Sequence, residues 1–204
     1  MKKYLYLCWL LSLLLPQLGQ SQSKKRATTA KPVTYMLDAS ASSIHWNGKK
    51  VIGEAHQGVL AFKGGKLLFT KSGKLKGGTL WVDMASIEVL DLTDQRKAKL
   101  EAHLKSADFF AVKEYPTASL HFKRVTENAQ KGYEVLAEMT IKGVTKTLSF
   151  TLSPAIAERS FQATLTIDRT LFGVCFAVET FSDYLAEKAI DKDFSLKAVS
   201  YTHL

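Results

Sequence analysis

Cysteine is scarce in this sequence of 204 residues and occurs only at Cys8 and Cys175. Cys8 lies in an N-terminal apolar run that we expect to be removed, which leaves Cys175 as the one thiol. A single thiol cannot form an internal disulfide, so a hydrophobic core must hold the fold, and roughly 180 residues suffice for one domain. Because Cys175 stands between Val174 and Phe176, we expect a buried, unreactive thiol.

Common enzyme signatures are also missing. The sequence contains no G-x-S-x-G elbow, no P-loop and no dinucleotide-binding fingerprint. These absences argue against an α/β-hydrolase, a P-loop nucleotidase and a Rossmann dehydrogenase.

A large net charge is missing from the chain beyond residue 31, although the formal net charge of the whole sequence is +9. Residues 1–31 contain six basic residues and no acidic one, which leaves +3 for the remainder. Such a value argues against a nucleic-acid-binding surface. We expect residues 22–33, which include the tract SKKRATTAKP, to form a flexible basic linker.

The N-terminus has the arrangement of a secretory signal. Two lysines precede the apolar run YLCWLLSLLL, and small residues around Ser21 suit cleavage by a signal peptidase. The run is shorter than a membrane span of ~20 residues. We predict a signal peptide over residues 1–21, cleaved near Ser21, and an exported domain over residues 34–204.

Apolar and polar residues alternate with a period of two through much of the chain from Tyr35 onward. This pattern is typical of antiparallel strands with one buried face, and glycine-rich turns separate the alternating stretches. Several stretches approach ten residues, which favours a closed barrel without free edges over a small sandwich. We predict an all-β fold, an antiparallel up-and-down β-barrel of about eight strands, which can enclose one small apolar ligand.

One segment interrupts the alternation. The stretch TDQRKAKLEAHLKS contains helix formers and places Leu100 and Leu104 on one stripe, with Thr93 or Asp91 as the N-cap. We predict an α-helix over about 93–105 in a connection between strands. The stretch SDYLAEKA, from Ser182, is a candidate for one further helical turn.

Two histidines lie eleven residues apart in SSIHWNGKKVIGEAHQG. His45 belongs to the polar face of its strand, whereas His56 shares a face with Leu60 and Phe62. With the apolar faces inward, the two imidazoles point to opposite sides of the sheet and cannot share a zinc ion. A β-bulge near Gly53 would restore the pair, so a metal-dependent hydrolase or isomerase stays open as an alternative.

The remaining histidines show no spacing typical of metal ligands. We expect His103, His121 and His203 to lie on the surface. His56 is expected to face the interior, either as a hydrogen-bonded core histidine or as a polar contact for a ligand.

Two further features each have two possible interpretations. Asp168-Arg169 follows the alternating stretch FQATLTI and is either an ion pair that fixes a turn or a site for an anionic head group. The aromatic cluster after the helix either plugs one barrel end or walls a lipid entrance; it consists of Phe109, Phe110, Tyr115 and Pro116.

Six blocks of the chain, taken in order, resemble the YceI-like family of exported lipid-binding proteins, over nearly all of residues 35–204. The blocks are Tyr35-x-Leu37-Asp38, SSIHWNGKKVIGEAHQG, GGTLWVDMASI, HLKSADFFAVKEYPTASLHF, MTIKGVTKTLSF and IDRTLFGV. The resemblance implies a lipocalin-like barrel with a long apolar cavity for a polyisoprenoid or isoprenoid quinone. It also implies a homodimer and the periplasm of a Gram-negative bacterium.

The chain departs from the family pattern at two places. Ala111 stands where relatives often carry an acid, and Cys175-Phe176 stands where many carry an arginine and a tyrosine. If that arginine holds a charged head group, its absence favours a less anionic ligand.

These observations predict a non-enzymatic protein that binds, transports or sequesters an amphiphilic isoprenoid-type lipid. We expect no catalytic residue, no metal, no nucleic acid, no cofactor other than a bound lipid or quinone, and at most transient membrane contact. An exported interaction module with a solid barrel is a further alternative. The predicted binding residues are inward-facing apolar side chains, with His56 and Arg169 as polar contacts; the apolar ones are Trp46, Leu60, Phe62, Leu80, Val82, Met84, Leu120, Phe122 and Phe150.

Overall fold

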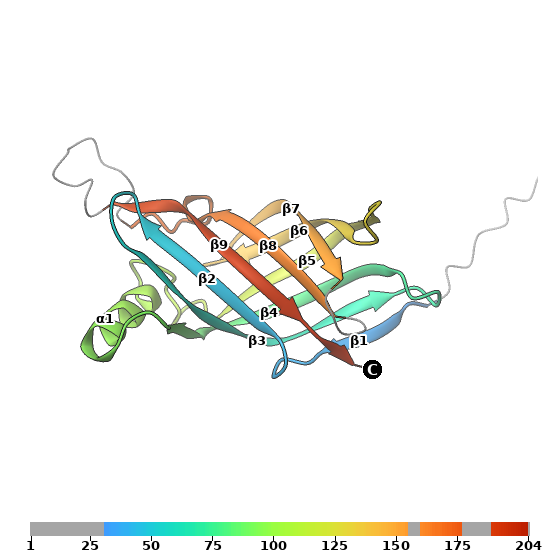
Figure 1. The fold of residues 1–204 in the computed structure, drawn as a ribbon, viewed down its shortest axis with the longest axis horizontal. Helices are drawn as coiled ribbons and strands as arrows, with labels where there is room; N and C mark the ends of the chain where they lie inside the picture. The colour runs from blue at the N-terminus through green and yellow to red at the C-terminus, as the bar shows by residue number, and fades with distance from the viewer. Residues whose placement is uncertain (1–30, 155–159, 177–188, 204) are drawn as a thin grey trace, which may run out of the picture.

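The computed structural model describes residues 31–154, 160–176 and 189–203. Eight antiparallel strands form a closed ring in which each strand pairs with its neighbour in the chain and β9 returns to pair with β2 (Figure 1). This confirms the predicted up-and-down barrel. The barrel strands are β2 (Ser43–Lys50), β3 (Ala55–Phe69), β4 (Leu75–Val89), β5 (Thr117–Glu127), β6 (Tyr133–Ile141), β7 (Val144–Pro154), β8 (Phe161–Asp168) and β9 (Ile190–Ser200).

Two short strands extend one end of the ring. The first part of β3 pairs with β2, and its last residues pair with β1 (Val33–Leu37). β1 in turn pairs with β10 (Thr202–His203). At this end the barrel is closed by an aromatic cluster, in which the ring of Phe69 packs against those of Tyr35 and Phe161.

The helix α1 (Asp94–Lys105) lies at the opposite end of the barrel from β1 (Figure 1). The predicted helix is therefore confirmed to within a residue. Thr93 occupies the N-cap position, but its side chain makes no capping hydrogen bond, and Asp91 bonds to β3 instead. Among the described residues, no helix is long and apolar enough to cross a membrane.

Two predicted segments cannot be compared with the structure. The signal peptide and most of the basic linker lie outside the described residues. The same holds for most of SDYLAEKA.

A bulge in β4 alters the alternation that the sequence suggests. Ala61 pairs with Asp83, but Val59 pairs with Glu88, so β4 contains extra residues between these two pairs. The hydroxyl of Ser86 fills the gap, because it accepts a hydrogen bond from the Ala61 N–H and donates to the Asp83 carbonyl. The bulge lets Met84 and Ile87, three positions apart, both bury their side chains.

Among the residues that the structure describes, β7 and β8 share fewer paired residues than any other barrel neighbours. Within the described residues their register contains only Ser153 opposite Gln162 and Pro154 opposite Phe161. The pair β6 and β7, in contrast, is in register from Tyr133 opposite Leu152 to Ile141 opposite Val144.

Gly58 allows the ring of Trp46 to lie directly on β3. A Cβ at Gly58 would stand 1.9 Å from the Glu88 carbonyl oxygen and 2.6 Å from a carbon of the Trp46 ring. We expect Gly58→Ala to lower the free energy of unfolding by about 2 kcal/mol or more, because the strands and the indole must move apart. Denaturant unfolding measures this change.

The matched control is Gly48→Ala on the neighbouring strand, since a Cβ there meets no atom within 4 Å. We expect a change within about 0.5 kcal/mol. Equal effects of the two substitutions would contradict the close packing of Trp46 on Gly58.

Candidate functional site

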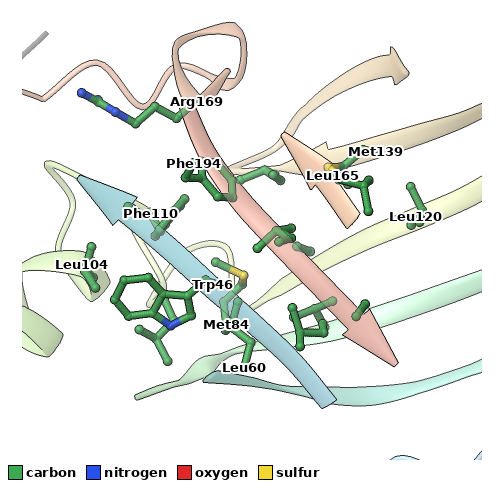
Figure 2. A pocket seen from close by; sticks show the side chains of 18 of the residues that line it. Trp46, Leu60, Met84, Leu104, Phe110, Leu120, Met139, Leu165, Arg169 and Phe194 are labelled. Carbon is green, nitrogen blue, oxygen red and sulfur yellow. The ribbon is translucent and has the colours of Figure 1, made fainter. Parts of the chain in front are cut away.

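The barrel encloses an apolar cavity with a volume of about 300 Å³. This volume is at the lower end of the ~300–1,000 Å³ found for small-molecule sites. All eight barrel strands and α1 contribute to its walls. Figure 2 shows side chains from these elements converging, among them Trp46, Leu60 and Met84.

The eleven side chains that we predicted to form the site all line this cavity. The register explains why: Ile44 lies opposite Leu60 and Trp46 opposite Gly58, so the even-numbered residues of β2 share the inner face with those of β3 from His56 to Phe62. The predicted lining residues are Trp46, His56, Leu60, Phe62, Leu80, Val82, Met84, Leu120, Phe122, Phe150 and Arg169.

The prediction missed the contribution of α1 and the loop after it. Leu100, His103 and Leu104 line the cavity, and so do Phe109 and Phe110. The expected surface position of His103 is wrong, because its ring is half-buried between Phe109 and the exposed Phe176. The spacing of Leu100, His103 and Leu104 was the available signal, since i, i+3 and i+4 share a helix face.

The aromatic cluster after α1 divides between two roles. Phe109 and Phe110 form part of the cavity wall beneath the helix. Tyr115 instead packs against Gly143 at the β6–β7 turn, and Pro116 accepts a backbone hydrogen bond from Met84. Only the two phenylalanines therefore fit the predicted wall of an entrance.

The surface of the cavity is almost entirely apolar, and the charged residues that line it are found at one end. The end near α1 is lined by charged or polar side chains, namely Lys49, Lys50, His56, Asp191 and Asp193. The other end is lined by Leu152, Phe161 and Ala163. Along β9 the lining runs from Ile190 to Ser200, a distance of roughly 33 Å at ~3.3 Å per residue. The cavity is therefore long and almost entirely apolar, with charged residues gathered at its end near α1.

His56 is held at the polar end by Asp91. Its Nδ1 lies 2.8 Å from Asp91 Oδ2, and the Gln57 N–H donates to Asp91 Oδ1 at 3.0 Å. Desolvation opposes ionisation of Asp91, but the hydrogen bonds from Gln57 and His56 outweigh it, so its pKa lies below the usual value.

His45 does not approach His56. It is exposed and pairs with Val59, whereas His56 pairs with Gly48 on the inner face. The predicted opposite orientation of the two rings is therefore confirmed. Among the described residues, no group of three or more histidines, cysteines or carboxylates could hold a metal ion.

Arg169 binds backbone rather than presenting its charge to the cavity. In the 3-10 helix η1 (Arg169–Phe172), its Nε, Nη1 and Nη2 donate to the carbonyls of Asp191, Val174 and Ile190 at 2.7–3.0 Å. The side chain is 2% exposed, and Figure 2 shows the guanidinium directed away from the other lining side chains. Burial lowers the pKa of Arg169.

Asp168 bonds to other partners than Arg169. It accepts hydrogen bonds from the Thr170 N–H and hydroxyl, and its ion pair is with Lys192. The expected ion pair within Asp168-Arg169 is therefore wrong, whereas a contact between Arg169 and a ligand head group stays a prediction, since Arg169 lines the cavity. The guanidinium instead bonds to the nearby carbonyl of Val174 and to two carbonyls at the start of β9, those of Ile190 and Asp191.

The expectation of a buried Cys175 is also wrong, since this thiol is exposed. Gly173, at a φ of 72°, turns the chain after η1, so Val174 points into the core while Cys175 and Phe176 point to solvent. Neither these two residues nor Ala111 lines the cavity. The departures from the family pattern thus lie outside its walls.

Removing the guanidinium of Arg169 should destabilise the fold. We expect Arg169→Met to lower the free energy of unfolding by roughly 3 kcal/mol, because three carbonyls lose a charged donor. The control Lys192→Met removes only exposed ion pairs and should change it by about 0.5 kcal/mol or less. Thermal or denaturant unfolding measures the stability of both variants. An Arg169→Met protein of unchanged stability would contradict the structural role of Arg169.

Both the sequence and the fold of this protein are similar to those of known proteins. The sequence model of the YceI-like domain matches residues 35–199. A UPF0312 protein of Pseudomonas putida (strain W619) is 34% identical over 85 residues, which are 38% of this chain and 44% of that protein. The matched part is thus less than half the length of these curated relatives.

Solved structures show the same architecture. BcnA of Burkholderia cenocepacia has a TM-score of 0.63 at 20% identity, covering 82% of this chain and 99% of that one. A polyisoprenoid binding domain from Saccharophagus degradans, implicated in plant cell wall breakdown, has a TM-score of 0.54 at 15% identity, covering 83% and 97%. The match over residues 35–199 shows that the chain belongs to the YceI-like domain family.

Proposed function

We propose that this protein is a non-enzymatic carrier that binds a polyisoprenoid or isoprenoid quinone inside the barrel. The observation that carries the proposal is the long, almost entirely apolar cavity, which has charged residues at one end. An extended hydrocarbon chain with one polar head matches this distribution. The polyisoprenoid binding domain of similar fold from Saccharophagus degradans supports the same class of ligand.

The burial of hydrocarbon is sufficient to drive such binding. Removing ~400 Å² of apolar ligand surface from water contributes ~10 kcal/mol at ~25 cal/mol per Å². Loss of translational freedom and ordering of the chain offset several kcal/mol of this. Micromolar or tighter affinity therefore requires no covalent chemistry.

The alternatives fit the geometry less well. A two-histidine metal site requires His45 and His56 on the same face, and they lie on opposite faces. A solid barrel that binds a partner on its outer face does not account for a 300 Å³ cavity. Metal analysis of the purified protein tests the first alternative, since a stoichiometric zinc content would support it.

We also propose that the protein is exported to the periplasm of a Gram-negative bacterium and acts there as a homodimer. The basis for export is the N-terminal sequence, in which two lysines precede an apolar run that ends before Pro16. Fractionation of cells expressing the full chain should recover a shortened protein in the periplasmic extract. A full-length cytoplasmic product would contradict export.

Native mass spectrometry tests the carrier proposal directly. After gentle purification of the protein, we expect a mass increment that disappears on solvent extraction, and an isoprenoid in the extract. Protein that is recovered empty and also fails to take up added isoprenoid would overturn the proposal.

Filling the cavity should abolish binding without unfolding the barrel. Leu60→Trp adds bulk on the inner face of β3, so we expect at least a tenfold loss of lipid affinity with an unchanged far-ultraviolet circular dichroism spectrum. Val59→Trp is the matched control, because Val59 pairs with the exposed His45 on the outer face. Equal loss in both variants would argue against an internal site.

A further inference from the structure

The histidine at the polar end of the cavity has a defined hydrogen-bonding state. A carboxylate can only accept, so Asp91 fixes the Nδ1 of His56 as a donor. In the neutral ring the other nitrogen, Nε2, is then an acceptor. No residue that the structure describes is hydrogen-bonded to this Nε2. His56 thus offers a lone pair at the edge of an apolar cavity.

The position of Asp91 makes this tautomer robust. Its Oδ1 is occupied by the Gln57 N–H, next to His56 in the chain, so the carboxylate is held by the same strand that carries the ring. His56 and Asp91 are each about one-fifth to one-quarter exposed. The dyad is therefore oriented by backbone before any ligand binds.

Few positively charged side chains near His56 and Asp91 are free to bind a multiply charged anion. Arg169 donates to three carbonyls, and Lys49 pairs with Asp191 at 3.3 Å. Asp193 adds a second carboxylate to the same end. Of the cations that line this end within the described residues, Lys50 and Arg169 have no carboxylate partner, but the Arg169 guanidinium is buried against its carbonyls. Lys50 is therefore the accessible unpaired cation, and one ammonium cannot balance a diphosphate.

We infer that His56, positioned by Asp91, accepts a hydrogen bond from a hydroxyl on an uncharged head group and so selects prenyl alcohols or quinols over prenyl diphosphates. This inference rests on the proposed function, because it assigns the polar end of the lipid cavity. Asp91 acts as a positioning residue, and the remaining specificity comes from the shortage of free positive charge.

Three probes that share one short prenyl chain separate the effect of hydrogen-bond donation by the head group from the effect of its charge. The probes are geraniol, geranyl methyl ether and geranyl diphosphate. Displacement of N-phenyl-1-naphthylamine at pH 8 gives their relative affinities. The ether cannot donate to Nε2 and leaves it unpaired, so we expect geraniol to bind about tenfold more tightly than the ether. Geranyl diphosphate should also bind at least tenfold more weakly than geraniol.

Three variants test whether His56 and Asp91 cause the preference for the alcohol. His56→Phe should bind geraniol and the ether with equal affinity, whereas His45→Phe, on the outer face of the neighbouring strand, should keep the tenfold preference. Asp91→Asn should keep the Gln57 contact through its oxygen and present its NH₂ to Nδ1, which makes Nε2 a donor. We expect this variant to lose or reverse the preference for the alcohol, a result that simple loss of packing would not produce.

The outcomes distinguish the two proposals. If neither the dye nor any probe binds, the carrier function itself fails. If all three probes bind the native protein with similar affinity, or the diphosphate binds most tightly, carriage stands and the head-group inference is overturned. An unchanged alcohol preference in His56→Phe would equally overturn it.

Discussion

The pairing of β9 with β2 is the constraint on which the rest of the structure depends. These strands are far apart in the chain, yet Trp46 lies opposite Leu196 and Ile44 opposite Ala198. Their hydrogen bonds turn an open meander into a ring, and the ring places one face of every strand around a common axis. An open sheet of the same sequence would expose those apolar faces to water. Closure therefore creates both the core and the cavity.

Local sequence patterns were sufficient for the architecture and for much of the cavity wall. Alternation along β3 predicted that His56, Leu60 and Phe62 share an inner face, because extended backbone forces successive side chains to opposite sides. The interruption at Thr93 likewise predicted α1. These inferences needed only short-range geometry, which a single sequence contains.

Features that depend on contacts between distant segments could not be predicted in this way. The position of His103 depends on where α1 docks on the barrel mouth, and the role of Arg169 depends on carbonyls about twenty residues further along the chain. The left-handed turn at Gly173 gives Val174 and Cys175 opposite environments despite their adjacency. In each case the determining neighbour is absent from the local pattern.

The short register between β7 and β8 has a mechanical consequence. Among the described residues these two strands share two opposed pairs, whereas every other pair of barrel neighbours shares at least five. Widening the ring there breaks the fewest backbone hydrogen bonds. The circumference of the tube is thus most easily changed along one longitudinal seam, beside Phe150 and Leu165, while the remaining wall acts as a stiff shell.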